Sequence, residues 1–130
     1  LDGGTVSAAH GAGVTLAVVG DGTLGCDVEP VAERSAEDWD GLLGGNAPLA
    51  ALISQETGES SDIAGTRVWS AIECLSKAGL PAGASLTLTP GRRNAWVVLA
   101  SGTLRIATLV TTLRDHPGPV VFAVLVEGRS

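Results

Sequence analysis

The chain has 130 residues, of which 45% are hydrophobic and 17% are charged, a composition typical of one globular domain rather than of a disordered segment. Its formal net charge of -6 and its pI of about 4.7 oppose binding to a phosphate backbone. Aromatic residues are only 3% of the chain, too few for the stacked rings of single-stranded nucleic-acid binding, so nucleic acid is not an expected partner.

The N-terminal part is predicted to be β structure. Asp21-Gly22 is a strong hairpin signal, and Pro30 ends the strand that follows it. The expected strands cover residues 5–10, 13–19 and 23–29.

Three helices are predicted next. Ser35 is an N-cap for a short helix that ends at Leu43 before two glycines, and a second short helix is expected over 47–56. Asp62 is expected to cap a long helix over 63–78, which Gly79 and Pro81 close.

The C-terminal part reads as strands separated by glycine and proline turns. These strands are expected over residues 85–89, 95–100, 103–113 and 120–126. The sequence therefore predicts an α+β fold, with one long helix and shorter helices packed on an antiparallel sheet. We expect one domain over residues 1–130.

Cellular context follows from the cysteines and the lack of long apolar runs. Cys26 and Cys74 are too few for a disulfide framework, so we expect two buried thiols in an intracellular, cytoplasmic protein. No apolar run approaches the roughly 20 residues of a membrane span, so no membrane partner is expected. Because the chain contains no Met, we expect it to be a piece of a longer polypeptide.

Four charged residues are predicted to meet at one site. Asp27 and Glu29 are two residues apart on a strand, so both project from one face. Glu73 and Lys77 are four apart on the long helix and share a face. If the helix packs across the strand, three hard oxygen donors and one cation come together, as a Mg2+-bound phosphate substrate requires.

Three strings in this order carry a resemblance to a known family. The strings are Val6-Ser7-Ala8-Ala9-His10, Gly25-Cys26-Asp27-Val28-Glu29 and the run from Trp69 to Lys77. Together they resemble the 4'-phosphopantetheinyl transferases of the surfactin-synthetase-activator type. They are most similar to the C-terminal transferase domain of bacterial enediyne polyketide synthases.

The resemblance implies an activity and a set of metal ligands. The enzyme would move 4'-phosphopantetheine from coenzyme A to a serine of an acyl carrier protein, within polyketide (enediyne) biosynthesis. It implies that Asp27, Glu29 and Glu73 hold Mg2+ against the pyrophosphate of coenzyme A. Glu73 would also be catalytic, because it could take the proton of the carrier serine either directly or through a metal-bound water.

The remaining roles concern phosphate binding. The resemblance implies that Lys77 lies at the same phosphates and assists the reaction, and that His10 contacts the 3'-phosphate of coenzyme A. Arg67 is a further candidate for binding coenzyme A, and Arg34 a substitute cation. Arg92 and Arg93 could add local attraction for the anionic substrates.

The sequence departs from the family pattern in two positions and in length. Ile72 occupies the position of the usual Lys before the metal-binding Glu, and Gly11 follows the His where the family has Ser. Transferases of this type have two similar halves, and this sequence matches the second. Either a preceding half is missing or copies of the chain associate.

Two other functions stay open at this stage. A catalytically degenerate copy would serve as a docking or assembly module in a megasynthase, which Ile72 favours. A hot-dog-like thioesterase or dehydratase also packs a long helix on a sheet, and there His10 would be the base.

Overall fold

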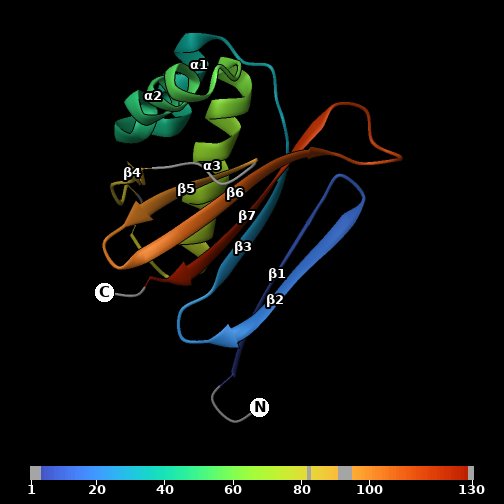
Figure 1. The fold of residues 1–130 in the computed structure, drawn as a ribbon, viewed down its shortest axis with the longest axis vertical. Coiled ribbons are helices and arrows are strands. Elements are labelled where there is room, and N and C mark those ends of the chain that lie inside the picture. Colours follow the sequence, from blue (N-terminus) through green and yellow to red (C-terminus); the bar gives the residue numbers. More distant parts are fainter. Residues whose placement is uncertain (1–3, 82, 91–94, 129–130) are drawn as a thin grey trace.

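The computed structural model describes residues 4–81, 83–90 and 95–128. Three helices and a short 3-10 turn lie against antiparallel β structure (Figure 1). The helical elements are α1 (Ala36–Leu43), η1 (Gly44–Asn46), α2 (Ala47–Thr57) and α3 (Ser61–Lys77). The strands are β1 (Gly4–Gly11), β2 (Val14–Asp21), β3 (Gly25–Pro30), β4 (Thr87–Leu88), β5 (Trp96–Ser101), β6 (Leu104–Thr112) and β7 (Pro119–Glu127). The predicted α+β class is confirmed.

The strands form two antiparallel sheets. β1 and β2 make a separate hairpin, and the other five strands are ordered β3-β7-β6-β5-β4. One expectation from the sequence is wrong here: the turn at Asp21-Gly22 does not pair β2 with β3. It carries the chain from one sheet to the other, and β3 pairs with β7 instead, Asp27 lying opposite Ala123.

The long helix α3 begins differently from the prediction. Ser60 is its N-cap, and its hydroxyl accepts a hydrogen bond from the Ile63 amide at 3.2 Å. Asp62 instead anchors the segment before α1, because Oδ1 accepts from the Trp39 indole at 2.9 Å and from the Arg34 amide at 3.1 Å. Ser60 and Asp62 could each cap the helix from its first turn. Ser60 is the cap because the carboxylate of Asp62 is taken up by its contacts with Arg34 and Trp39.

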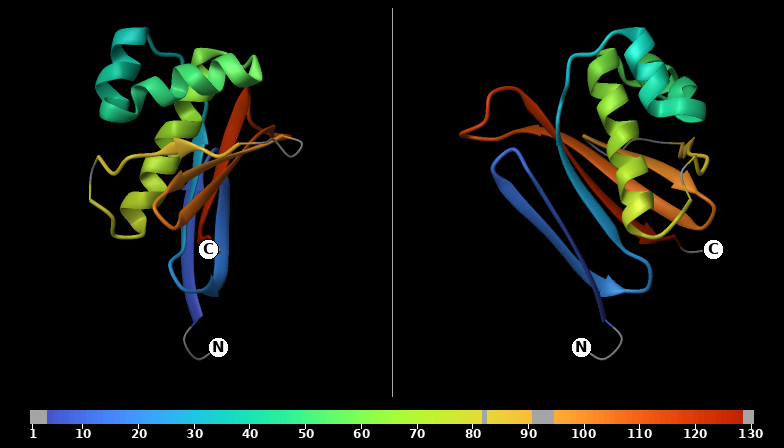
Figure 2. Two further views of the ribbon diagram at one scale, coloured as in Figure 1. Left: turned by 60° about the vertical axis from the view of Figure 1, so that its left-hand side comes forward. Right: turned by 180° about the vertical axis from the view of Figure 1, so that it is seen from behind.

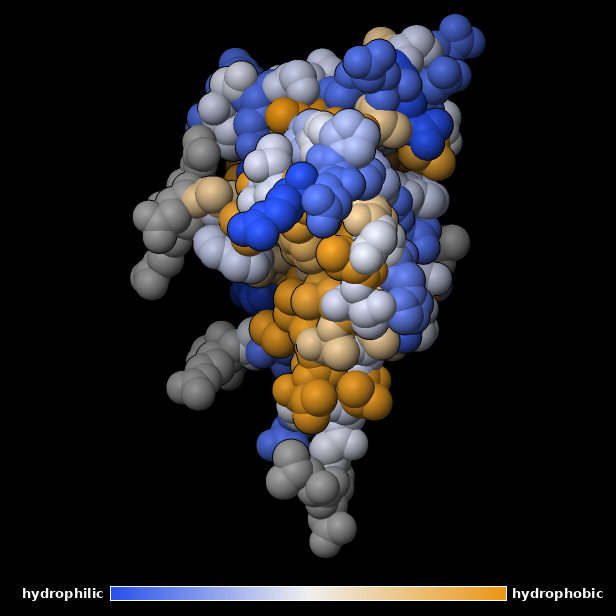
Figure 3. Space-filling view, turned by 90° about the vertical axis from the view of Figure 1, so that its right-hand side faces the viewer, coloured by the Kyte–Doolittle hydropathy of each residue, from blue (hydrophilic) through white to orange (hydrophobic). Residues whose placement is uncertain are grey.

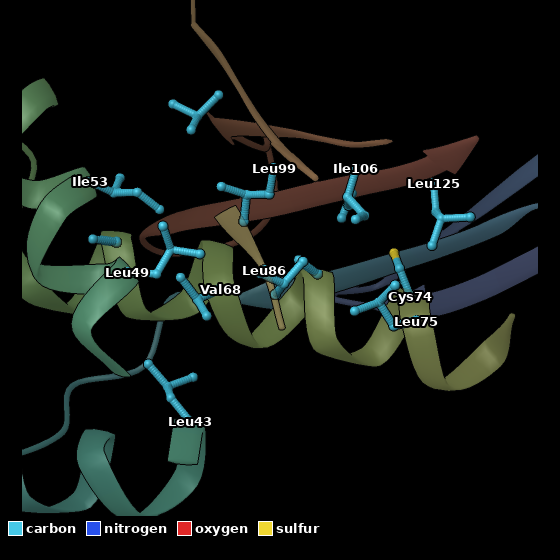
Figure 4. Close-up of a cluster of buried hydrophobic side chains, with 14 of the residues drawn as sticks. Leu43, Leu49, Ile53, Val68, Cys74, Leu75, Leu86, Leu99, Ile106 and Leu125 are labelled. Atoms are coloured by element: carbon cyan, nitrogen blue, oxygen red, sulfur yellow. The ribbon is translucent and has the colours of Figure 1, made fainter. Parts of the chain in front are cut away.

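The main core lies between the helices and one face of the five-stranded sheet. Aliphatic side chains from all three helices meet those of β5, β6 and β7 (Figure 4). α3 approaches α1 closely at Gly65, where a Cβ atom would lie 2.7 Å from the Trp39 ring. In both views of Figure 2, α3 lies along the sheet.

A smaller core joins the hairpin to the opposite face of β3. Its buried members are Ala9, Cys26, Val28 and Val120. Because side chains alternate along a strand, β3 packs Cys26 and Val28 on the hairpin and turns its odd-numbered side chains toward α3. β3 is thus enclosed between two layers.

Arg67 of α3 is buried beneath the helices and is 1% exposed. Its guanidinium forms a two-pronged ion pair with Glu59, at 2.9 Å and 2.7 Å. It also donates to both oxygens of Thr108, at 2.7 Å and 2.9 Å, and to the Ala95 carbonyl at 3.3 Å. These five hydrogen bonds use the full donor capacity of an arginine.

No helix in the described part of the chain is long and apolar enough to cross a membrane.

Neutralising Glu59 should destabilise the fold strongly. Glu59→Gln leaves the guanidinium of Arg67 buried without its counter-charge, so we expect a loss of about 3 kcal/mol of unfolding free energy. Urea denaturation of the variant and the wild type measures this loss of unfolding free energy. Glu56→Gln makes the same charge change on an exposed residue of α2 and is expected to cost less than about 0.5 kcal/mol. Equal losses in the two variants would contradict the assignment of Arg67 as a structural residue.

Candidate functional site

The candidate site lies where α3 crosses β3, and a glycine makes the crossing close. A Cβ atom at Gly25 would lie 2.7 Å from the carbonyl oxygen of Cys74, so only glycine lets the two backbones approach this far. Asp27 follows two residues later on the face of β3 that meets α3, and it is 5% exposed. The close packing of β3 against α3 therefore requires the glycine of the Gly-x-Asp-x-Glu string.

Two side chains of α3 hold the Asp27 carboxylate. The buried Ser70 hydroxyl donates to Oδ2 at 2.9 Å. The Lys77 ammonium lies 3.6 Å from Oδ1 and donates to the Cys26 carbonyl at 2.9 Å. Lys77 therefore hydrogen-bonds to the backbone of β3 and forms an ion pair with the Asp27 carboxylate. About a third of its side chain stays exposed.

Glu29 lies beside this pair in an environment that disfavours its charge. Partial burial is the main cause, followed by the charge of Asp27. The charge of Glu73 adds to the effect, while Lys77 opposes it; together they raise the pKa of Glu29 from 4.5 to about 7. Asp27, Glu73 and Lys77 are thus close enough to Glu29 for their charges to shift its pKa.

The donor set fits Mg2+ in its chemistry. Asp27 pairs with Lys77, and a dication would relieve the repulsion from Asp27 and Glu73 that adds to the effect of burial on the pKa of Glu29. Among the residues that the structure describes, no three His, Cys, Asp or Glu side chains already converge as a metal-binding group. Mg2+ is commonly held by one or two carboxylates, with waters and substrate phosphates completing its shell. Asp27 and Glu29 project from one face of β3 and could hold it, with Glu73 of α3 as a further oxygen donor.

His10 lies on the hairpin, on the side that faces away from β3. Its neighbours Ala9 and Gly11 pack toward β3, so strand alternation turns the ring outward, where Nδ1 is 2.9 Å from the Thr15 hydroxyl. His10 is exposed and is not among the groups that act on the pKa of Glu29. The structure therefore places His10 on a different layer from the carboxylates.

Arg67 requires a correction. The sequence proposes it as a ligand for coenzyme A, but its guanidinium is buried and all of its donors are occupied by Glu59, Thr108 and Ala95. It could reach a phosphate only if the core opened, so we remove it from the candidate site.

The other candidate cations divide into two groups. The Arg34 guanidinium stacks over the Trp39 ring at 5.4 Å from its centroid, near the start of α1. Arg92 and Arg93 lie outside the described residues. Lys77 is thus the candidate cation that the structure brings to the carboxylates.

Both departures from the family pattern have a packing explanation. At Gly11 a Cβ atom would lie 2.6 Å from the Val28 carbonyl oxygen, so the hairpin could not approach β3 with Ser at this position. Ile72 is half-buried against the main core, and with Trp69 it lines a groove of about 370 Å3 that reaches Glu73. Where the family has a cation, this chain has apolar surface.

The two cysteines are buried free thiols, as expected. Burial raises the pKa of Cys74, and the nearby charge of Asp27 raises it further. Burial thus disfavours the thiolate of Cys74, which is the form that acts as a nucleophile or a metal ligand.

Ser70 is the site residue that sequence reasoning missed. A signal was available, because residues 70, 73 and 77 have the i, i+3, i+7 spacing of one helical stripe. A lone serine in a helix seldom attracts attention, however, and its partner on β3 is distant in sequence.

A comparison with protein-family models finds no match for the chain, and a comparison with curated proteins finds none either.

The raised pKa of Glu29 predicts a pH dependence of stability. Between pH 4.5 and about 7 the folded protein keeps a proton that the unfolded chain has lost, so the wild type should lose stability as pH rises through this window. Glu29→Gln removes the titrating group and should lack this fall, becoming the more stable protein at pH 8. Urea denaturation of both proteins between pH 4 and 8 measures the difference. If the unfolding free energies of the two proteins changed with pH in parallel, the pKa of Glu29 would not be raised in the folded state, and this prediction would be wrong.

The close crossing at Gly25 predicts a steric cost for any side chain. Gly25→Ala must push α3 off β3, so we expect a loss of about 1–3 kcal/mol. Gly20→Ala is the matched control, because a Cβ atom there would lie 3.7 Å from the nearest atoms of Leu24, an ordinary contact. Thermal or urea unfolding of the two variants compares them, and a Gly25→Ala protein as stable as wild type would contradict the crossing.

Proposed function

We propose that this chain is a Mg2+-dependent 4'-phosphopantetheinyl transferase that acts in the cytoplasm on an acyl carrier protein in polyketide (enediyne) biosynthesis. The observation that carries the proposal is the cluster of Asp27, Glu29, Glu73 and Lys77 at the crossing of β3 and α3. Two of the three ordered strings that resemble the family fall on these two elements, and the third, which contains His10, falls on β1. The carrier and coenzyme A are the proposed partners, and His10 stays a proposed contact for the 3'-phosphate.

In the proposed reaction the carrier serine oxygen bonds to the β-phosphorus of coenzyme A, and the bond to the bridging oxygen breaks. The products are phosphopantetheinyl-serine and 3',5'-ADP. Glu73 takes the serine proton, and Lys77 neutralises charge on the phosphates. Mg2+, held by the carboxylates, would supply positive charge to the pyrophosphate. Since the protein does little covalent chemistry in phosphoryl transfer, positioning and charge neutralisation carry most of the catalysis.

Labelling of a carrier protein by fluorescent coenzyme A tests the proposal. Glu73→Gln and Asp27→Asn keep the side-chain shapes but remove the carboxylates, so we expect labelling to slow by about 100-fold or more. Glu37→Gln changes an exposed acid of α1 and should label at the wild-type rate. Full activity in both site variants would refute the assignment.

A docking or assembly module remains the second candidate, because Ile72 gives the site apolar surface beside Glu73. Calorimetry with Mg2+ and coenzyme A separates the two functions, since a docking module should show no heat of binding.

A thioesterase or dehydratase that uses His10 as its base would keep its activity in EDTA, whereas the transferase would lose it. A transferase that needs a second copy or a preceding half would label carrier only when that partner is present.

A further inference from the structure

Ser70 makes an unusual hydrogen bond for a serine inside a helix. Such hydroxyls commonly donate to the backbone carbonyl four residues earlier. Thr66, one turn away on α3, does this and donates to the Asp62 carbonyl at 2.7 Å. Ser70 instead reaches across to β3 and donates to Oδ2 of Asp27 at 2.9 Å.

Both ends of this bond are shielded from water. Ser70 is fully buried and Asp27 is 5% exposed. A hydrogen bond to a charged carboxylate is stronger than one between neutral groups, and a carboxylate left without it at such a buried position would carry a desolvation cost. The hydroxyl therefore restrains where the carboxylate points.

Lys77 restrains the other oxygen of Asp27. Its ammonium lies 3.6 Å from Oδ1, and it is seven residues after Ser70, two turns along the same stripe of α3. The two contacts hold the carboxylate at both oxygens, yet an ionised carboxylate has about four lone-pair sites. The two contacts from α3 therefore leave lone pairs of Asp27 unused by this helix.

We propose that Ser70 is a positioning residue that sets the orientation of Asp27 for a divalent cation shared with Glu29. This inference rests on the proposed function, because it concerns the cation of that site. Removing a hydrogen-bond partner of a metal ligand typically costs 10- to 100-fold in metal affinity. Ser70 thus acts through Asp27 and does not itself touch the substrate.

The first test is independent of any metal. Ser70→Ala and Asp27→Asn are combined in a double-mutant cycle, with the unfolding constant measured by urea denaturation. If the hydroxyl restrains the carboxylate, the unfolding constant of the double variant should rise by less than the product of the fold-changes that the two single substitutions cause. Simple multiplication of the two effects would overturn the inference and leave the proposed function unaffected.

The second test uses Mn2+ alone as a probe, with free Mn2+ followed by electron paramagnetic resonance at a temperature where every variant is folded. Ser70→Ala should bind Mn2+ about 10-fold more weakly than wild type. Thr66→Val removes the other buried hydroxyl of α3, away from the carboxylates, and should bind like wild type. Equal affinity in Ser70→Ala and wild type would overturn the positioning role, whereas a wild type that binds no Mn2+ would overturn the metal site of the proposed function together with this inference.

Discussion

The contact of α3 with β3 at Gly25 is the constraint on which the candidate site depends. The absence of a side chain at Gly25 brings the strand backbone against the Cys74 carbonyl, and this places residues of α3 within bonding distance of Asp27. Burial of β3 between two layers excludes water from Asp27 and partly from Glu29, which strengthens the charge interactions between them. The electrostatics of the site therefore follow from a packing contact.

Arg67 supports the same arrangement from the far end of the helix. Its bonds to Glu59, Thr108 and Ala95 tie α3 to the turn before it, to β6 and to the residue that precedes β5. The helix is thus held in its first half by a buried ion pair and at its last residue by the hydrogen bond of Lys77 to β3. These contacts fix the position of α3, and with it Glu73 and Lys77, against β3.

The sequence predicts the elements well because their signals are local. Helical spacing, the Ser35 cap and strand alternation place the helices, most of the strands and the shared faces of Asp27 with Glu29 and of Glu73 with Lys77. It fails where the outcome depends on distant partners. The turn before β3 looks like a hairpin turn although β3 pairs with β7, Arg67 reads as a free cation although Glu59 and Thr108 occupy it, and Ser70 reads as an ordinary helical serine although Asp27 is its partner.

The hairpin itself is only half covered. Val6 and Val19 face each other across its outer side and are 67% and 66% exposed, and Figure 3 shows apolar surface on this side of the molecule. Its inner side covers Cys26, while α3 covers Cys74 on the other side of β3. The two thiols are therefore natural reporters of separate opening events. The rate of Cys26 alkylation would report detachment of the hairpin, and that of Cys74 alkylation would report movement of the helix away from the sheet, because a buried thiol reacts only after its cover moves.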